Sequence, residues 1–257
     1  MPMDILKTYR DKLKNGEKHY QISEVKSPTH SLIIAKEILN EIKNGIFEIK
    51  YYASGEEPIR DNFDFTSHFG EYKKSSNNEK PLCRSWFNDP NKVPSCLKKY
   101  GAIIDYECSL LEKKNDKTNI DLVSFSNLDG QNIFYLWEVK GSGKVDEENK
   151  TVKYSSSESL LRAVLEIETY YQTLLKNGVI DNFKQTIGAH LFNIDNRLNS
   201  MVKKIVVVPN GSKAAEQIND ETIMEIAKEL NIEVVCFDAI QPKIDMTKLI
   251  DKNRKKL

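Results

Sequence analysis

The chain has 257 residues, of which 39% are hydrophobic and 30% are charged, a composition typical of a globular protein long enough for one large domain. Lysine and arginine number 38, and aspartate and glutamate also number 38, so the formal net charge is zero. Proteins that coat nucleic acid non-specifically are usually strongly basic, which excludes this class. Any contact with nucleic acid must therefore use a local basic patch.

No apolar run approaches the roughly 18 to 20 residues of a membrane span. The N-terminal segment MPMDILKTYRDKLKNG lacks the apolar stretch of a secretory signal. The cysteines are scattered without a CxxC pair, at Cys83, Cys96, Cys108 and Cys236. This pattern argues against a structural zinc site or a disulfide framework and favours a reducing compartment. We therefore expect a cytoplasmic protein without a membrane partner.

Helical patterns come first in the chain. Residues 1–20 are heavily charged and are expected to form a solvated helix. A second helix is predicted over 27–45, where Ser27 or Thr29 can cap the N-terminal end and an apolar stripe follows. The segment GIFEIKYYA, residues 45–53, is predicted to be a strand.

Residues 54–97 are rich in Ser, Asn, Gly and Pro and show no sustained periodicity, which predicts a long loop. A loop of that length inside a domain is usually functional or mobile. If the protein binds nucleic acid, the best candidates for phosphate contacts are the basic residues of this loop: Lys73, Lys74, Lys80 and Arg84. The alternative is an exposed insertion without a role.

Three runs typical of strands then follow one another, over 101–112, 119–127 and 131–141. Short polar segments separate them, including Leu-Asp-Gly before the third run. Consecutive strands with such turns predict an antiparallel meander. GSGK at 141–144 lacks the spacing of a P-loop and is expected to be a flexible exit from the third strand.

The rest of the chain alternates between helix and strand. A strong helix is predicted over 155–178, with a serine cluster to cap it and a glycine to end it. Strands are predicted over 203–210 and 232–238, whose inner parts IVVVP and IEVVCF are apolar runs typical of strands buried on both faces, and one helix is predicted between them over 212–230. The fold class expected from these elements is α/β.

One pair of residues at the end of the third strand carries chemistry. Glu138 and Lys140 are two positions apart, so their side chains point the same way where an apolar strand ends. Asp121 lies near the start of the second strand, which in an antiparallel pair lies beside the end of the third. Two carboxylates and the carbonyl of Val139 form an all-oxygen site suited to Mg²⁺ or Mn²⁺. Lys140 could orient or deprotonate a water molecule, or neutralise charge on a phosphorane-like transition state.

The order IDLVSF, IFYLWEVKG and then a helix resembles the core of the PD-(D/E)XK nuclease superfamily, over about residues 100–210. The resemblance implies a restriction-endonuclease-like mixed β-sheet flanked by helices, with an N-terminal helical extension. It implies Asp121 and Glu138 as ligands of Mg²⁺ or Mn²⁺ and Lys140 as the catalytic lysine. The sequence departs from the motif at Ile120, where the motif has proline.

A polar stripe on the following helix adds to this resemblance. Ser159, Arg162, Glu166 and Tyr170 recur at intervals of three and four residues. The stripe resembles the QxxxY element of some superfamily members, with Glu166 in place of the glutamine. Such residues would bind substrate or hold Lys140 by hydrogen bonds, with Arg162 as an anion contact. The alternative is a surface salt bridge between Arg162 and Glu166 with a partly buried Tyr170.

Members of this superfamily usually carry one more acidic residue. Glu107 on the first meander strand is the better candidate, because that strand should neighbour the strand of Asp121. Glu37 and Glu41 on the preceding helix are the other candidates. Glu107 could equally be a simple cross-strand partner. His30 is expected to be a residue of the helix start rather than a metal ligand.

The expected organisation is an N-terminal helical extension with a long loop (1–97), a nuclease-like core (98–240) and a basic tail (241–257). The leading hypothesis is a metal-dependent nuclease that hydrolyses phosphodiester bonds, with DNA as the expected substrate, in restriction, phage defence or repair. The alternatives are a catalytically silent module of the same fold that binds nucleic acid or a protein, and a nuclease domain that works only inside a larger complex. Cleavage of both strands by one site per chain would call for a homodimer.

Overall fold

The computed structural model describes residues 2–53, 59–60, 80–111, 118–185 and 200–242. Two expected phosphate contacts, Lys73 and Lys74, lie outside the described residues, as do residues 186–199 and the tail from 243. Within the described ranges, no helix combines the length and the apolar character that crossing a membrane requires.

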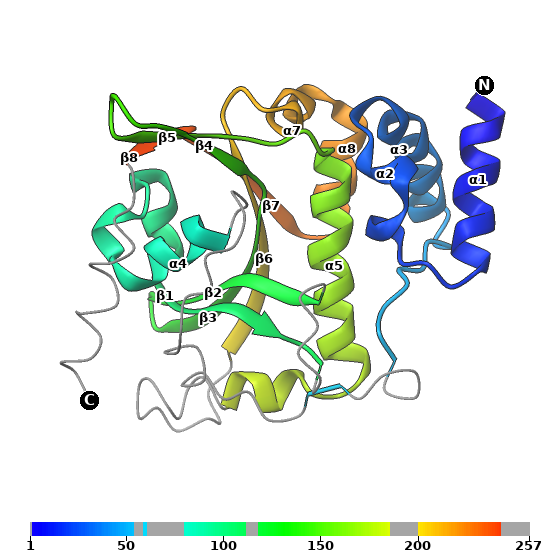
Figure 1. Cartoon of the computed structure of the whole chain (residues 1–257). Helices are drawn as coiled ribbons and strands as arrows, with labels where there is room; N and C mark the ends of the chain where they lie inside the picture. The colour runs from blue at the N-terminus through cyan, green and yellow to red at the C-terminus, as the bar shows by residue number, and fades with distance from the viewer. Residues whose placement is uncertain (1, 54–58, 61–79, 112–117, 186–199, 243–257) are drawn as a thin grey trace.

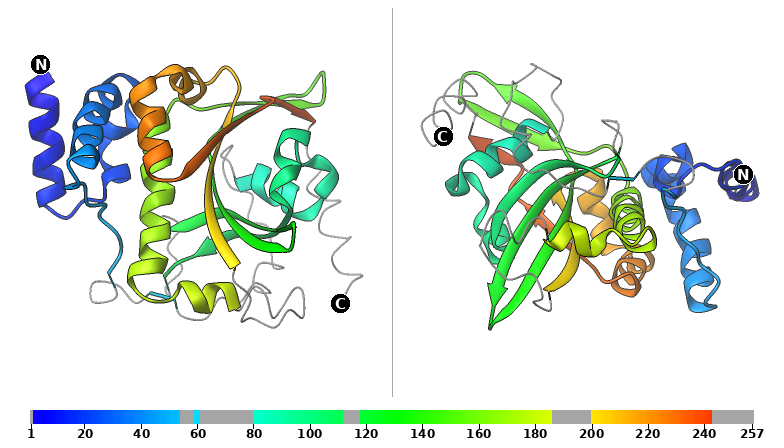
Figure 2. Two further views of the ribbon diagram at one scale, coloured as in Figure 1. Left: turned by 180° about the vertical axis from the view of Figure 1, so that it is seen from behind. Right: turned by 90° about the horizontal axis from the view of Figure 1, so that it is seen from below.

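The centre of the fold is a mixed five-stranded sheet with helices on both faces (Figures 1 and 2), so the expected α/β class is confirmed. Its strands are β1 (Ala102–Ser109), β2 (Asn119–Leu128), β3 (Gln131–Val139), β6 (Ser200–Pro209) and β7 (Ile232–Phe237), in the order β1-β2-β3-β6-β7. Strands β1, β2 and β3 form the predicted antiparallel meander, whereas β3, β6 and β7 run parallel. The meander and the parallel part therefore meet at β3.

The turn between β2 and β3 fixes how these strands pair. Asp129 and Gly130 have φ angles of 50° and 78°, the left-handed backbone that a two-residue Asp-Gly hairpin turn requires. With this turn, Leu122 pairs with Trp137, and the register therefore places Asp121 opposite Glu138. The local turn chemistry thus brings these two carboxylates to one end of the sheet.

The side chains of the sheet divide between two hydrophobic cores. On β3, Phe134 and Leu136 belong to the core on one face, and Ile133, Tyr135 and Trp137 belong to the core on the other. This alternation is the period-two pattern of a strand buried on both sides. Glu138 and Lys140 follow at the same spacing of two residues, so their side chains lie on the same face of the sheet as Phe134 and Leu136.

Helix α5 (Leu160–Lys176) covers that first face, as predicted (Figure 1). The Ser159 hydroxyl accepts a hydrogen bond from the Arg162 amide at 3.0 Å and so caps the helix. Gly178, with a φ of 70°, follows the C-terminal end. The side chains of α5 that face the sheet are almost entirely buried.

The N-terminal helices pack on the same side of the sheet and share its core. They are α1 (Pro2–Lys14), η1 (His19–Gln21), α2 (Ser23–Lys26) and α3 (Pro28–Lys43). Ser27 caps the predicted helix α3 by accepting a hydrogen bond from the His30 amide. Both α2 and α3 contact α5. The N-terminal residues therefore form part of the wall around α5.

The prediction of a long loop is wrong for residues 80–97. This stretch contains α4 (Lys80–Asn88), η3 (Pro90–Lys92) and the first half of η4 (Ser95–Tyr100), which cover the second face of the sheet. Leu82, Cys83 and Trp86 of α4 are buried there. Their spacing suits one face of a helix, but the helix is short and follows a polar, aperiodic segment, so the pattern was too brief to recognise.

The predicted strand over 45–53 is also wrong. The segment is extended, but it pairs with no strand of the described chain. Its backbone bonds to side chains of α5 and the residue after it instead: the Tyr52 amide donates to the Thr173 hydroxyl at 3.2 Å, and the Asn177 side chain donates to the Tyr52 carbonyl at 2.7 Å. Buried backbone groups need a partner, and here side chains supply it.

A small second sheet occupies the segment expected to be a flexible exit. β4 (Ser142–Asp146) and β5 (Thr151–Ser155) form a hairpin, and β8 (Ile240–Pro242) pairs with β5. Most β4 side chains are at least partly exposed, so the hairpin has no hydrophobic pattern that would reveal it. It extends away from the main sheet in Figure 1.

Two predictions in the C-terminal part are wrong in detail. The single helix expected over 212–230 is divided into α7 (Lys213–Glu216), η5 (Gln217–Asn219) and α8 (Glu221–Glu229). Asp220 ends the first part and caps α8 by accepting a hydrogen bond from the Ile223 amide at 3.0 Å. β7 is an edge strand and is only partly buried, whereas the inner part of β6 is buried on both faces.

The buried His19 makes the stability of the N-terminal part depend on pH. Burial, with a smaller contribution from the positive charge of Lys50, lowers the pKa of His19 to about 4, although the ring bonds to the Glu48 carbonyl. A histidine with a lowered pKa contributes stability that is present above its unfolded pKa of about 6.5 and is lost as the pH falls through the folded value. We expect a loss of about 3 kcal/mol of unfolding free energy between pH 7 and pH 4 from this group.

Urea unfolding at several pH values measures that loss. A His19→Gln variant should show a flatter profile by this amount, and His30→Gln, changed at an exposed histidine, is the matched control. Equal slopes for wild type and His19→Gln would contradict the prediction.

Candidate active site

A cavity of about 550 Å³ lies where β3 ends, between the sheet, α5 and the N-terminal helices. Four acidic and four cationic side chains line it, namely Glu107, Asp121, Glu138 and Glu166, and Lys26, Lys80, Lys140 and Arg162. The formal charges of the lining therefore cancel. Because charged side chains are rarely gathered in a cavity without pairing or function, this one is the principal candidate for chemistry.

Two carboxylates meet at the ends of β2 and β3. The Asp121 carboxylate accepts a hydrogen bond of 2.8 Å from the Val139 amide, which holds it beside the end of β3. Glu138 lies opposite in the register and is only 2% exposed. Its Oε1 contacts Lys140, whereas its Oε2 is buried without a hydrogen-bond partner in the described structure. A buried acceptor left without a partner is costly unless another group binds it.

Lys140 is buried between two carboxylates. Its Nζ contacts Glu138 and lies 2.6 Å from Oε2 of Glu166, and the residue is 4% exposed. Glu158 lies further away, at 3.9 Å. The backbone amide of Lys140 donates to the Val207 carbonyl at 2.9 Å, so β6 fixes the main chain behind the side chain.

Burial and charge together set the ionisation of this cluster. Burial raises the pKa of Glu138 well above its ordinary value, and the nearby Asp121 and Glu166 carboxylates raise it further. Burial by itself lowers the pKa of Lys140, but Glu138 and Glu166 more than offset this, so the pKa is raised. Burial also opposes ionisation of Glu166, yet Lys140 and Arg162 keep its pKa below the ordinary value. Burial and the neighbouring carboxylates thus disfavour the charged form of Glu138, whereas Lys140 and Glu166 each favour the charged form of the other.

The polar stripe of α5 faces the cavity. The Tyr170 hydroxyl donates to Oε1 of Glu166 at 3.1 Å, while Oε2 of the same carboxylate binds Lys140. Arg162 lies 3.6 Å from Glu166 and also contacts Glu158. Glu166 and Tyr170 are buried, so the alternative of a surface salt bridge with a partly buried tyrosine does not describe this arrangement.

Glu107 lies on β1 beside the strand of Asp121 and also lines the cavity. Its φ of 53° is in the left-handed region, which is unusual for a glutamate within a strand. It forms an ion pair of 2.9 Å with Lys80 at the start of α4, so one expected phosphate contact reaches the cavity. Arg84 of α4 does not line it, and Glu37 pairs with Arg10 elsewhere.

Several lining residues were missed by sequence reasoning. Asn119 is two positions before Asp121 on β2, so the same strand spacing that singles out Glu138 and Lys140 could have found it. Its Oδ1 is buried without a hydrogen-bond partner in the described structure. Tyr20 and Lys26 come from the N-terminal helices, and no local pattern in the sequence places them near β3.

The free oxygen atoms of this cavity suit a hard cation. Asn119 and Glu138 each present a buried oxygen without a partner in the described structure, and Asp121 lines the same cavity. Among the described residues, no group of three or more His, Cys, Asp or Glu side chains is arranged to hold a metal ion. Mg²⁺ commonly takes only one or two protein carboxylates and completes its shell with other oxygens, so this donor set fits it. The Val139 amide binds Asp121, and the Val139 carbonyl stays a predicted metal ligand.

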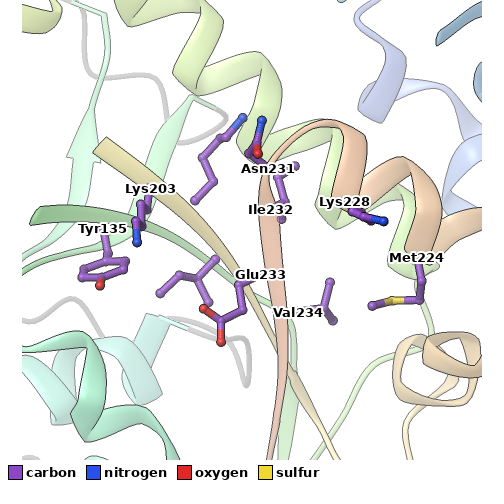
Figure 3. Close-up of a pocket in the computed structure, with 10 residues that line it drawn as sticks. Tyr135, Lys203, Met224, Lys228, Asn231, Ile232, Glu233 and Val234 are labelled. Carbon is purple, nitrogen blue, oxygen red and sulfur yellow. The ribbon is translucent and has the colours of Figure 1, made fainter. Parts of the chain in front are cut away.

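A second cavity, of about 510 Å³, lies near β7 and α8 (Figure 3). Glu233 is the one acidic residue in its described lining, which includes Lys203 and Lys228. Glu233 is already bound by Lys99 at 2.8 Å and by the Tyr100 hydroxyl. This cavity therefore lacks the paired carboxylates and unpartnered oxygens of the first.

No match emerges when the chain is compared with models of protein families, with curated proteins and with solved structures. The function must be inferred from the cavity itself.

Proposed function

We propose that the protein is a metal-dependent nuclease of the PD-(D/E)XK type, which hydrolyses phosphodiester bonds of DNA in the cavity at the end of β3. The observation that carries the proposal is the arrangement of Asp121, Glu138 and Lys140, with one Glu138 oxygen buried and unpartnered. An antiparallel meander followed by a parallel strand, with α5 in the connection between them, is consistent with a restriction-endonuclease-like core.

In this proposal Asp121 and Glu138 hold Mg²⁺, with the Asn119 side chain as a further oxygen donor. A divalent ion would supply charge stabilisation for the phosphoryl oxygens and favour attack by water. It would also relieve the repulsion between the two carboxylates and give the second Glu138 oxygen a partner. The substrate would provide some of the remaining oxygen ligands.

Lys140 acts as a fixed positive charge in this proposal. Its raised pKa favours the ammonium form, which can orient the attacking water and stabilise negative charge that develops on the phosphoryl group. A lysine that remains protonated is a poor proton acceptor, so the role of general base is less well supported.

Glu166 and Tyr170 position Lys140. Glu166 binds the ammonium through one oxygen and receives the Tyr170 hydroxyl on the other, so both oxygens of the carboxylate are oriented. Such supporting hydrogen bonds lock the rotamer of the group that acts on the substrate. The glutamate at this position thereby supplies the negative partner that a buried lysine needs.

An Asp121→Asn variant tests the proposed site. Asparagine can still accept the hydrogen bond from the Val139 amide but lacks the charge, so the fold should persist while Mn²⁺ affinity falls at least about tenfold, or ~1.4 kcal/mol. Calorimetric titration with Mn²⁺ measures the affinity, and nicking of a supercoiled plasmid in Mg²⁺ measures the activity.

Asp11→Asn, which removes an exposed charge from α1, is the matched control and should behave as wild type. Wild-type protein that binds DNA but does not cleave it under any divalent ion would support the catalytically silent module instead. Unchanged Mn²⁺ affinity in Asp121→Asn would remove this residue from the metal site.

A further inference from the structure

Lys26 is a cation of the cavity that the proposed chemistry does not use. It is the last residue of α2, is half-buried, and lines the cavity together with Arg162 and Lys140. The sequence gives no reason to connect it with β3, because more than a hundred residues separate them.

One serine anchors Lys26 beside Arg162. The Ser159 amide donates to the Lys26 carbonyl at 3.0 Å, and the Ser159 hydroxyl donates to the Val25 carbonyl. The same hydroxyl accepts from the Arg162 amide at 3.0 Å. The backbone of Lys26 is therefore fixed to the N-terminal end of α5, one helical turn from Arg162.

Lys26 also differs from the other cations of this cavity in its pairing. Lys80, Lys140 and Arg162 each form an ion pair with a carboxylate. Among the described residues, Lys26 has no carboxylate within ion-pair distance. Burial lowers its pKa, and the positive charges of Arg162 and Lys140 lower it further. The charges of the whole lining cancel, but Lys26 adds a positive charge near Arg162 that no described carboxylate pairs with, and a bound anion would be stabilised there.

We propose that Lys26 and Arg162 form an anion subsite that holds a backbone phosphate of the DNA substrate next to the metal-binding carboxylates. This assignment rests on the proposed function for its choice of substrate and makes the N-terminal helices part of the substrate-binding surface. The Nε of Arg162 is buried without a hydrogen-bond partner in the described structure, so this guanidinium retains donor capacity. Lys26 belongs to α2 and Arg162 to α5, and both would bind the same phosphate.

A charge-removing variant at Lys26 tests the subsite. Lys26→Met keeps the length of the side chain, and its affinity for a short DNA duplex in EDTA should fall about tenfold, because a charge-assisted contact is lost. The slope of log affinity against log salt should become shallower by about 0.9, the value for one phosphate contact on duplex DNA. Lys26→Arg should retain most of the affinity and the slope.

Lys36→Met is the matched control, because it removes an exposed lysine from α3 outside the cavity. It should change neither the affinity nor the slope, and thermal melting should show that all variants fold. Equal affinities and slopes for Lys26→Met and Lys36→Met would overturn the subsite. Titration with inorganic phosphate is a separate arm: loss of phosphate binding in Lys26→Met with unchanged DNA binding would assign a site for free anions instead, and would overturn the proposal.

The cleavage assay separates this inference from the proposed nuclease. DNA binding that depends on Lys26 in a protein without metal-dependent cleavage would retain the subsite and reject the nuclease. Cleavage with the same KM in Lys26→Met as in wild type would retain the nuclease and reject the subsite. Wild-type protein that binds neither DNA nor phosphate would overturn both.

Discussion

Replacing Lys140 by methionine is expected to reduce metal-dependent cleavage of DNA by at least about 100-fold, the effect of removing one group that stabilises developing charge. The same change should destabilise the protein by about 3 kcal/mol in metal-free buffer. Lys140 is buried, and without it Glu166 would lose its closest cation. The same substitution at an exposed strand end would leave the free energy of unfolding nearly unchanged, whereas at this buried position it should lower it.

Single-turnover nicking of a supercoiled plasmid, at a temperature where the variant remains folded by circular dichroism, measures the first effect. Urea unfolding in EDTA measures the second. Lys153→Met, which replaces an exposed lysine on β5, is the matched control and should lose neither activity nor stability. Cleavage by folded Lys140→Met at the wild-type rate would remove this residue from the mechanism.

Replacing Glu138 by glutamine is expected to have opposite effects on activity and stability. Cleavage should fall by at least about 100-fold, because a metal ligand is lost. In metal-free buffer, however, the variant should be more stable than wild type. Burial, Asp121 and Glu166 all disfavour the ionised form of Glu138 and outweigh the opposing effect of Lys140, so the pKa is raised and this carboxyl group destabilises the metal-free fold at neutral pH. Glutamine has the same shape and carries no charge.

Thermal melting of wild type and Glu138→Gln with and without Mn²⁺ tests this prediction. An ion that binds only the folded state should raise the melting temperature of wild type by an amount equivalent to about 2.7 kcal/mol at 100 times its Kd. Glu138→Gln should start higher and respond little, so that the order of the two proteins reverses as Mn²⁺ is added. Lower stability of Glu138→Gln in EDTA, or an undiminished response to Mn²⁺, would contradict the proposed role of this carboxylate.

The parts of the fold that could be predicted are those with a long, regular hydrophobic pattern. The meander and α5 each bury most of one or both faces, so their period appears in the sequence. The hairpin of β4 and β5 is largely exposed on β4 and leaves no such pattern. In the segment 45–53 apolar and charged residues alternate from Phe47 to Tyr51 as in a strand, but the backbone partners of Tyr52 are side chains of the α5 region. Local sequence cannot distinguish these two ways of satisfying an extended backbone.

The cavity likewise contains residues whose placement follows from local sequence and residues whose placement depends on tertiary packing. The placement of Asp121 opposite Glu138 follows from a two-residue turn and the spacing along a strand, both of which are local. Arg162, Glu166 and Tyr170 follow from helical spacing on one element. Tyr20 and Lys26 reach the cavity only because the N-terminal helices pack on α5, which depends on tertiary contacts between distant segments. Whether these residues bind metal and DNA stays a prediction.

The length of the Asp129–Gly130 turn determines which side chains of β2 and β3 lie opposite one another in the cavity. Because side chains alternate along a strand, one inserted residue that shifted the pairing by a single position would turn a carboxylate away from its neighbour. Insertions in the turn between β4 and β5 should therefore be tolerated in related sequences, because they leave the register of β2 and β3 unchanged. An insertion in the β2–β3 turn would instead change the relative position of the two carboxylates. The shortest loop of the sheet would be the least free to change.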